Sequence, residues 1–370
     1  MRDKTKPYND LPQLPPAIDV ESKAVLKACV AARAALAELR MADQILPNPD
    51  LLVQVIPLLE ARASSEIENI VTTNDALFRH ASLQDDDGDP AAKEALRYRE
   101  ALYHGVASLK ARPLSTRTAV EVCSLVKGTA LDIRSTPGTA LANAQTREVI
   151  YTPPEGEDRL RGMLANADRF WHERTDIDPV VRMAILHYQF EAIHPFIDGN
   201  GRTGRILNVL CLIEAGLIDR PTLYLSRYIL ATRAEYYRLL ARVTTDGDWE
   251  AWLIYVLTGI TQTAKWTNAK TAAIRALMNE TLALVQKRAP KIYSADLVTL
   301  IFDLPYCRIG NLVEHRIAKR QAASTYLKTL TDIGVLEERK VGRDKLFLHV
   351  KYAELLYSET HEFAPYPHDP

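Results

Sequence analysis

One twelve-residue stretch, HPFIDGNGRTGR at residues 194–205, constrains this chain more than any other part of its sequence. It combines one histidine, one carboxylate, three glycines, one asparagine and two arginines. The packing of a hydrophobic core does not require that mixture. Asp178-Pro179 ahead of an apolar run predicts a helix that ends near Ile193. Arg202–Ala215 predicts a second helix, with Gly216 as its stop. The polar stretch therefore connects two helices.

The residue types in this stretch suit the binding of a polyphosphate. Gly199-Asn200-Gly201 can enter positive-φ conformations and bring N–H groups close to an anion at a helix N-terminus. Arg202 and Arg205 are three residues apart, so both guanidinium groups can lie along one side of the first turn. Asp198 is a hard oxygen ligand suited to Mg²⁺, and His194 is suited to act as a general base near neutral pH. The stretch predicts a phosphoryl- or nucleotidyl-transfer site.

The same residues resemble a known signature. They fit all eight specified positions of H-x-F-x-[D/E]-G-N-G-R-x-x-R, the motif of Fic-domain proteins, at His194, Phe196, Asp198, Gly199, Asn200, Gly201, Arg202 and Arg205. Eight specified positions in twelve are far more specific than a lone glycine pattern. The chain therefore resembles the Fic family of protein adenylyltransferases, and the roles given next are what that resemblance implies.

The resemblance implies transfer of AMP from ATP to a protein, which is called AMPylation. His194 would take the proton from a Tyr, Thr or Ser hydroxyl of a target protein, or of the chain itself. The oxygen would then attack the α-phosphate of ATP, and pyrophosphate would leave with Mg²⁺ held by Asp198. Such charge development on phosphate oxygens needs prepositioned donors and a cation. Phe196 would anchor the loop in the core.

The remaining residues of the motif would hold the nucleotide. Asn200 and the amides of Gly199 and Gly201 would bind the α- and β-phosphates. Arg202 would neutralise the leaving group, and Arg205 would bind the γ-phosphate. The predicted nucleotide-binding set is Asp198, Gly199, Asn200, Gly201, Arg202, Thr203, Gly204 and Arg205.

A second stretch, Ser64-Ser65-Glu66-Ile67-Glu68-Asn69, resembles the inhibitory motif [S/T]-x-x-x-E-[G/N] of Fic proteins. The resemblance implies that Glu68 forms a salt bridge with Arg205 where the γ-phosphate should bind, with Ser64 and Asn69 as the other matching positions. A carboxylate and a guanidinium are geometrically well matched for such a contact. The motif precedes the catalytic stretch in the same chain, which corresponds to the N-terminal self-inhibited class of the family.

The segment QTREVIY, Gln145 to Tyr151, is the clearest strand signal in the first half of the chain, and Pro153-Pro154 follows it. Fic proteins place a β-hairpin flap here, which pairs with a strand of the target and covers the nucleotide. The resemblance carries over to the segment, and it offers Arg147, Glu148, Val149 and Ile150 as individual contacts.

The predicted fold class is mainly α: a Fic-type helical bundle with a β-hairpin flap, followed by a small winged helix-turn-helix domain. Residues 6–16, with four prolines, predict an extended arm lying on the body. Predicted helices outside the motif are Val20–Gln44, Ala91–Leu109, Ser115–Leu125, Glu157–Glu173, Ser226–Val243 and Trp249–Lys287. The expected domains are an N-terminal helical region at 1–90 with an inhibitory helix near 60–70, a catalytic core at 91–288, a winged helix at 290–352 and a tail at 353–370.

Beyond Ala289-Pro290 the pattern changes to helices at 294–302, 309–315 and 319–333 and strands at 335–338 and 345–349, which resembles a winged helix. Residues 307–351 contain ten Lys or Arg and five Asp or Glu, while the whole chain has a net charge of −1. DNA contacts would come from the start of the recognition helix and from the wing. The candidates are Arg316, Lys319, Arg320, Gln321, Arg343 and Lys345. Winged helices also serve in dimerisation and protein docking, so both uses stay open.

Composition sets the remaining expectations. A hydrophobic share of 47% and a near-neutral charge describe a globular protein with no overall drive to bind polyanions. The first sixteen residues lack an apolar h-region, and no run approaches a membrane span, so a cytoplasmic location and no membrane partner are expected. Four widely separated cysteines predict free buried thiols. A homodimer is expected, with Trp249–Lys287 as a bundle or a dimer face.

Alternatives remain at this stage. The chain could be a transcription regulator whose Fic core only senses nucleotide, although such a sensor has no need of His194. The same site could remove AMP from a modified protein, with Glu68 positioning water. Other Fic proteins transfer different phosphate-containing groups, so ATP is an expectation from the resemblance.

Overall fold

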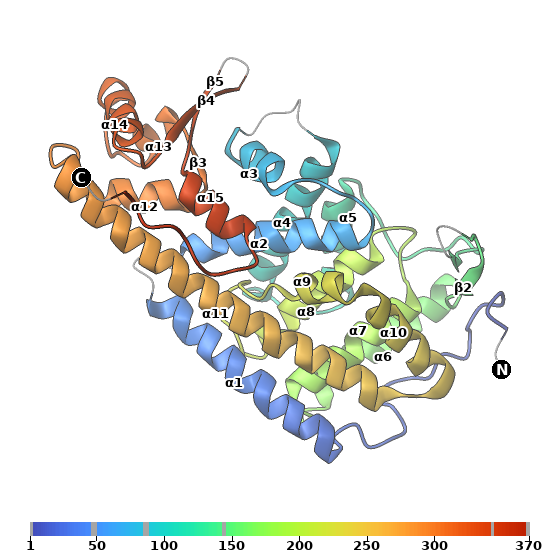
Figure 1. Cartoon of the computed structure of the whole chain (residues 1–370). Helices are drawn as coiled ribbons and strands as arrows, with labels where there is room; N and C mark the ends of the chain where they lie inside the picture. Colours follow the sequence, from blue (N-terminus) through green and yellow to red (C-terminus); the bar gives the residue numbers. More distant parts are fainter. Residues whose placement is uncertain (1–2, 46–49, 84–88, 143–145, 342–343, 368–370) are drawn as a thin grey trace.

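Two long helices, α1 (Lys23–Ile45) and α11 (Trp249–Arg288), lie side by side along one edge of the molecule (Figure 1). The structure is a computed structural model that describes residues 3–45, 50–83, 89–142, 146–341 and 344–367. Along α1 the buried side chains recur at the three- to four-residue spacing of one helix face, at Val25, Cys29, Ala32, Leu36 and Leu39. This amphipathic face packs α1 against α11, which forms a spine for the rest of the fold.

The remaining helices of the first 250 residues pack against this spine and around one another. At the centre lie α7 (Pro179–Ile193) and α8 (Asn200–Glu214), the pair that the polar stretch connects. Around them are α2 (Asp50–Ile67), α3 (Asn74–Leu83), α4 (Pro90–Leu109), α5 (Thr116–Lys127), α6 (Glu157–Glu173), α9 (Leu225–Ala231) and α10 (Arg233–Asp246). The mainly helical fold class is confirmed.

The start of α7 shows why the sequence folds this way locally. Asp178 accepts a hydrogen bond from the backbone N–H of Val180 at 2.9 Å, and Pro179 occupies the first turn. This cap satisfies one of the free donors at the helix start. The buried indole N–H of Trp252 on α11 donates to the carbonyl of Ala184 at 2.9 Å, which fixes α7 against the spine.

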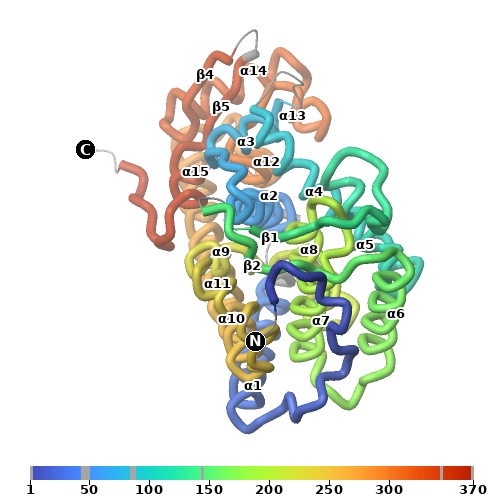
Figure 2. The backbone as a smooth tube through the Cα atoms, turned by 90° about the vertical axis from the view of Figure 1, so that its right-hand side faces the viewer, coloured from blue at the N-terminus to red at the C-terminus, as the bar shows by residue number. Residues whose placement is uncertain are grey.

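A short antiparallel hairpin precedes α6. Strands β1 (Leu141–Ala142) and β2 (Val149–Tyr151) pair with Leu141 opposite Tyr151. The observed strand is shorter than the predicted one, whose first residue, Gln145, lies outside the described residues. The N-terminal arm runs beside this region, where the Tyr8 N–H donates to the Thr152 carbonyl at 3.0 Å (Figure 2). The expected extended arm on the body is therefore observed.

The C-terminal unit contains helices and a three-stranded sheet of order β3-β5-β4. Strand β5 lies in the middle and pairs antiparallel with both neighbours, with Phe347 opposite Cys307 on one side and Glu338 on the other. The elements are α12 (Ala295–Asp303), β3 (Tyr306–Cys307), α13 (Ile309–Glu314), α14 (Arg320–Asp332), β4 (Glu337–Val341), β5 (Asp344–Leu348) and α15 (Val350–Tyr357). This order of helix, strand, two helices and hairpin agrees with the predicted fold class.

Several details differ from the sequence-based expectation. The helix predicted at 226–243 is two helices that meet at Thr232, whose backbone leaves the helical region at φ −121° and ψ 32°. The Thr232 hydroxyl bonds the Tyr228 carbonyl at 2.7 Å and lies 2.8 Å from the Tyr255 hydroxyl. Side-chain bonds of this kind compete with the helical ladder. Helix α15 also extends past residue 352, so the boundary expected there falls inside a helix.

The four cysteines are free and buried, as expected. Within the described residues, no helix is long and apolar enough to cross a membrane.

The chain after α15 is fastened to α11 by one buried lysine. The ammonium of Lys270 donates to the carbonyls of Leu355, Ser358 and Thr360 at 2.6, 2.9 and 2.7 Å. Tyr366 lies near the same helix, with its hydroxyl 3.0 Å from that of Thr281. The C-terminal segment is therefore an integral part of the fold.

We expect Lys270→Met to lower the free energy of unfolding by about 2–4 kcal/mol, because it leaves three carbonyls without their donor. Urea denaturation measures this loss, and limited proteolysis should show faster cleavage after residue 357. Lys265→Met, at an exposed position of the same helix, is the matched control and should be neutral. Equal stability of the two variants would contradict the fastening role.

Candidate active site

The loop between α7 and α8 is closed by a side chain from the first turn of α8. Asn200 accepts a hydrogen bond from the Phe196 N–H at 2.9 Å and donates to the Phe196 carbonyl at 2.8 Å. Phe196 is fully buried, as expected of an anchor. Helix α8 begins at Asn200, two residues earlier than predicted, and of the glycine turn only Gly199 has a positive φ, at 84°. The Asn200 side-chain amide thus binds the loop backbone, and its predicted phosphate contact stays a prediction.

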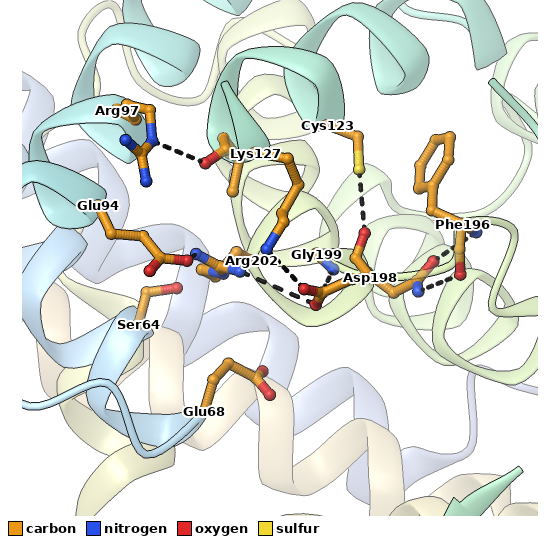
Figure 3. A network of polar contacts seen from close by, with 12 residues as sticks. Ser64, Glu68, Glu94, Arg97, Cys123, Lys127, Phe196, Asp198, Gly199 and Arg202 are labelled. Atoms are coloured by element: carbon orange, nitrogen blue, oxygen red, sulfur yellow. Dashed lines mark hydrogen bonds and ion pairs between the residues drawn. The ribbon is translucent and has the colours of Figure 1, made fainter. Parts of the chain in front are cut away.

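Gly201 in the first turn of α8 lies directly beneath a carboxylate. A Cβ at this position would come within 2.3 Å of Glu68 Oε1 and 3.0 Å of Arg205 Nη1. A side chain at position 201 therefore fits only if the Glu68 carboxylate moves away. Because free N–H groups and the helix dipole favour negative charge at a helix start, the Glu68 carboxylate occupies an anion-binding position. Figure 3 shows Ser64 on α2 and Glu68 on the turn that follows this helix.

Arg205 is the cation that holds this carboxylate. Its side chain is 2% exposed, and its Nη2 lies 2.9 Å from Glu68 Oε1. Nε donates to the Ser64 hydroxyl at 2.7 Å, and Nη2 also donates to the Ser64 carbonyl at 2.9 Å. Burial alone would lower the pKa of Arg205, but the Glu68 charge, with smaller contributions from neighbouring groups, raises it above its usual value. The guanidinium is fully charged, and it is hydrogen-bonded to residues at the end of α2.

Asn69, the third residue singled out in the 64–69 stretch, contacts a different helix. Asn69 adopts a left-handed conformation at φ 63°, where Asn is more readily accommodated than most residues. Its side-chain oxygen accepts a hydrogen bond from Arg233 of α10 at 3.0 Å. The structure therefore brings Ser64 and Glu68 to Arg205, while Asn69 turns the chain and ties it to α10.

The Asp198 side chain extends from the loop toward two cationic side chains. Lys127, the last residue of α5, places its ammonium 2.5 Å from Asp198 Oδ2, and Arg202 Nη2 lies 4.0 Å from Oδ1 (Figure 3). Arg202 is itself buried and ion-paired with Glu94 of α4. Partial burial opposes ionisation of Asp198, but the Lys127 ammonium holds its pKa below the usual value. The Asp198 carboxylate remains 63% exposed, which leaves it accessible to a ligand.

The donor set at Asp198 fits Mg²⁺ only in company with a phosphate. Among the described residues, no three or more His, Cys, Asp or Glu side chains gather as a metal site. Mg²⁺ keeps several waters and is commonly bound by one or two carboxylates together with substrate phosphates. An exposed single carboxylate beside an anion-binding helix start matches that pattern.

His194 ends α7 in a left-handed conformation, at φ 51°. Burial, followed by the positive charge of Arg134, lowers the pKa of His194 to about 4. Its Nδ1 is buried, and a backbone hydrogen bond of Glu191 acts against part of this lowering of the pKa. At neutral pH the imidazole is therefore uncharged, and an unprotonated ring nitrogen can accept a proton.

Two buried carboxylates close to Arg205 were not singled out from the sequence. Glu60 on α2 accepts hydrogen bonds from the Ser226 N–H at 2.9 Å, from the Ser226 hydroxyl and from the Tyr98 hydroxyl at 3.3 Å. Burial raises the pKa of Glu60 to about 7, and it does the same for Glu191 on α7. The site thus holds carboxyl groups that ionise near neutral pH.

Other predicted residues lie elsewhere. Thr203 is fully buried, and a Cβ on Gly204 would meet Glu191 Oε1 at 2.6 Å, so both positions are used in packing α8 against its neighbours. On the hairpin, Arg147, Glu148 and Ile150 are exposed and Val149 is half-buried. In the described part of the chain, no hydrogen bond or ion pair joins residues 147–150 to residues 194–205. The individual flap contacts stay predictions.

The candidate DNA contacts form a partly exposed group. Arg316, Lys319, Arg320 and Gln321 are exposed at and before the start of α14. On the wing, Lys345 is ion-paired with Glu338 at 2.6 Å. Arg343 lies outside the described residues.

Sequence reasoning missed the side chains that reach the motif from other helices and loops. They are Glu60, Glu94, Lys127, Arg134 and Glu191. None belongs to a local pattern that distinguishes it from an ordinary surface charge. Their signal is burial, which a single sequence does not display.

Family comparisons agree with this geometry. Residues 26–107 match a profile described as "Fic/DOC family N-terminal" and residues 118–212 one described as "Fic/DOC family". Residues 277–352 match "Protein adenylyltransferase SoFic-like, C-terminal domain". The chain thus carries two Fic/DOC family domains and a SoFic-like C-terminal domain, which confirms the resemblance drawn from the motif.

Among curated proteins, the chain is 44% identical over 107 residues to protein adenylyltransferase fic-1 of Caenorhabditis elegans, covering 29% of this chain and 20% of that protein. It is 48% identical over 62 residues to a probable protein adenylyltransferase of Aquifex aeolicus (strain VF5), covering 17% of this chain and 19% of the relative. The matched segment spans about a fifth of the length of these relatives.

Solved structures share the fold. A Fic family protein from Desulfovibrio desulfuricans G20 aligns with a TM-score of 0.56 at 18% identity, covering 90% of this chain and 98% of the other. A Fic domain containing signaling protein from Bacteroides thetaiotaomicron aligns with a TM-score of 0.51 at 17% identity, covering 68% and 97%. At sequence identities this low, the structural similarity shows a shared fold and nothing more.

The raised pKa of Glu60 predicts a pH dependence of stability. Because the neutral form is favoured in the folded state, its contribution is complete below the unfolded pKa of about 4.5 and is lost as the pH rises through about 7. Between about pH 4.5 and 7 this costs about 3 kcal/mol of unfolding free energy, and little further change follows above pH 7. In urea denaturation, the unfolding free energy of Glu60→Gln should fall by that much less than that of wild type over the same pH interval. Glu66→Gln, on the same helix, should keep the wild-type slope, and parallel curves for all three proteins would refute the assignment.

Proposed function

We propose that this protein is an adenylyltransferase that transfers AMP from ATP to a hydroxyl group of a target protein, and that Glu68 holds it inactive. One observation carries the proposal: the Glu68 carboxylate lies over Gly201 at the start of α8 and is paired with the buried Arg205. A carboxylate held in an anion-binding position marks that position as one built for phosphate. The loop beside it carries His194 and Asp198, a base and a metal ligand.

In the proposed reaction the neutral His194 accepts the proton of a Tyr, Thr or Ser hydroxyl. The hydroxyl oxygen forms a bond to the α-phosphorus of ATP as the bond from that phosphorus to the bridging oxygen breaks, and pyrophosphate leaves. Arg205 and the free N–H groups at the start of α8 hold the phosphates in place. Mg²⁺, held by Asp198 and the phosphates, would supply charge neutralisation at the leaving group.

Arg202 supports this arrangement from beneath the loop. It is buried between Asp198 and Glu94, so its charge is already shared between two carboxylates. Placed in this way, it steadies Asp198 and adds positive potential at the leaving group. Lys127 contributes a second cation on the exposed side of Asp198.

Inhibition follows from competition for one position. The γ-phosphate of ATP and the Glu68 carboxylate both require Arg205, and two anions cannot share one guanidinium without repulsion. Glu68 lies just beyond the last residue of α2 and is 35% exposed, so it can move while α2 stays packed. A bound nucleotide would therefore be misplaced until Glu68 moves away.

The organisation of the chain is part of the proposal. We assign residues 1–90 to an inhibitory region, 91–288 to the catalytic core and 290–357 to the C-terminal domain, in which α15 is included. The hairpin at residues 141–151 would offer its edge to a strand of the target, since exposed strand edges pair readily with extended segments.

Transfer of label from ATP labelled on the α-phosphate tests the function. Wild type should label protein weakly, Glu68→Gly at least about tenfold more, and Glu68→Gly/His194→Ala not at all. Tenfold corresponds to about 1.4 kcal/mol, which a partly buried charged hydrogen bond can supply. The measurement is label on protein in a denaturing gel with Mg²⁺ present.

Glu66→Gly is the matched control, because Glu66 pairs with Arg62 on the same helix and should leave labelling at the wild-type level. Absence of label in Glu68→Gly with every nucleoside triphosphate and with added cell extract, while nucleotide binding persists, would refute transfer. A nucleotide-sensing regulator would then be favoured.

A second proposed function is DNA binding by the C-terminal domain. It is favoured by the exposed group Arg316, Lys319, Arg320 and Gln321 at the start of α14. Replacing Lys319 and Arg320 together by Glu should abolish binding to duplex DNA in a gel-shift assay. The wild-type affinity should fall steeply with salt, because phosphate contacts release counterions. Salt-independent or undetectable wild-type binding would contradict this function.

A further inference from the structure

The carboxyl end of α7 carries the proposed base, and its carbonyl groups are bound by side chains from outside the helix. The last carbonyls of any helix lack partners within it. Here the Phe190 carbonyl accepts the N–H of His194 at 2.9 Å. The Ala192 carbonyl accepts the Tyr151 hydroxyl at 2.8 Å, and the Ile193 carbonyl accepts Arg134 Nη2 at 3.2 Å.

Arg134 makes most of these contacts. Its Nε donates to the His194 carbonyl at 2.7 Å, and its own backbone N–H donates to the Pro195 carbonyl at 2.9 Å. Nη2 also donates to the carbonyl of Pro154, three residues after the flap strand β2. One side chain therefore joins the end of α7, the beginning of the 194–205 loop and the base of the flap.

The environment of Arg134 is unusual for a charged side chain. It is 3% exposed, and among the described residues no carboxylate lies within ion-pair distance of it. A buried charge is costly unless it is well hydrogen-bonded, and the negative end of a helix dipole is a favourable neighbour for a cation. The carbonyls at the end of α7 therefore bind Arg134 in place of a direct ion pair, and the more distant charge of Glu155 adds to their effect.

His194 needs such support because of its backbone. A left-handed conformation costs a residue with a side chain about 1–2 kcal/mol, and surrounding contacts must maintain it. The conformation at φ 51° sets the direction of the imidazole at the end of α7. The hydrogen bonds from Arg134 to the carbonyls of Ile193 and His194 hold the peptide groups on both sides of the His194 α-carbon.

We propose that Arg134 is a positioning residue for His194, which fixes the base in its left-handed conformation and sets its place relative to the flap. This inference rests on the proposed function for its kinetic consequence, but its structural part stands alone. The nucleotide is held by α8, which Arg134 does not contact, so loss of Arg134 should affect the transfer step much more than ATP binding.

The kinetic test uses the released background, Glu68→Gly. Arg134→Met should lower kcat about 100-fold, as expected for a displaced catalytic group, while KM for ATP changes less than about threefold. Arg134→Lys, which keeps one charged donor, should recover part of kcat. Arg161→Met is the matched control, because Arg161 is a surface arginine paired with Asp132 close to Arg134, and it should behave as its parent.

Hydrogen exchange provides a readout that does not depend on activity. The amides of His194 and Phe196 should exchange at least tenfold faster in Arg134→Met than in Arg161→Met, with the amides of α8 unchanged. If Arg134→Met does not fold, the same comparison between Arg134→Lys and its parent decides the question. Failure of Glu68→Gly to transfer any label would refute the proposed function and leave the exchange measurement to test Arg134 by itself.

Three results would overturn the proposal. One is kcat within threefold of the parent in Arg134→Met. Another is a parallel loss of kcat, ATP affinity and thermal stability without recovery in Arg134→Lys, which would indicate a general structural role. The third is unchanged exchange at His194 and Phe196.

Discussion

Arg205 brings a full positive charge into the helical interior, where its nearest compensation comes from a neighbouring helix. The guanidinium binds the hydroxyl and carbonyl of Ser64 and the carboxylate of Glu68, so the end of α2 is fixed where Arg205 requires it. A buried cation without a partner would be strongly destabilising, and this constrains every element around it. The position of α2, the glycine at 201 and the shape of the anion position all follow from the need to satisfy this one group.

Polar side chains at two positions within helix α2 hold the helix in place. Glu60 and Ser64 are spaced by four residues and so share one face of the helix, and Glu68 follows just beyond its last residue. Glu60 binds Ser226 of α9 and Tyr98 of α4, deep in the core. Because Glu60 and Ser64 keep the helix in place, release of the anion position requires movement of the Glu68 side chain only. The proposed inhibitory contact could thus be broken without unfolding α2.

Much of the fold was accessible from the sequence, and the reasons are local. Asp178-Pro179 and the apolar periodicity define α7, and the sequence predicts the second helix from Arg202, two residues after its observed start. Thr232 could not be recognised as a break, because its hydroxyl contacts with Tyr228 and Tyr255 depend on tertiary packing. The short strand β3 pairs with β5 some forty residues later, and such pairing leaves little local signal.

The site was predicted in part for the same reason. The motif and the 64–69 stretch identify residues by their spacing, and the structure brings Ser64, Glu68 and Arg205 together. The bonds between the Asn200 amide and the Phe196 backbone were not predicted, because they depend on the fold of the loop, and the phosphate contact of Asn200 stays a prediction. Lys127 and Arg134 come from segments without a motif, and they matter through burial and position alone.

Two buried arginines flank the loop, and their surroundings give them opposite roles. Arg134 lies at the carboxyl end of α7, where the helix dipole is negative and the carbonyls satisfy its donors, so it has no need of a mobile anion. Arg205 reaches back over Gly201 toward the positive end of α8, where the dipole adds to its own charge. Its anion in this structure is the Glu68 carboxylate, and in the proposed reaction a phosphate would take that place. The first arginine is suited to hold the loop in one geometry, and the second is suited to exchange one anion for another.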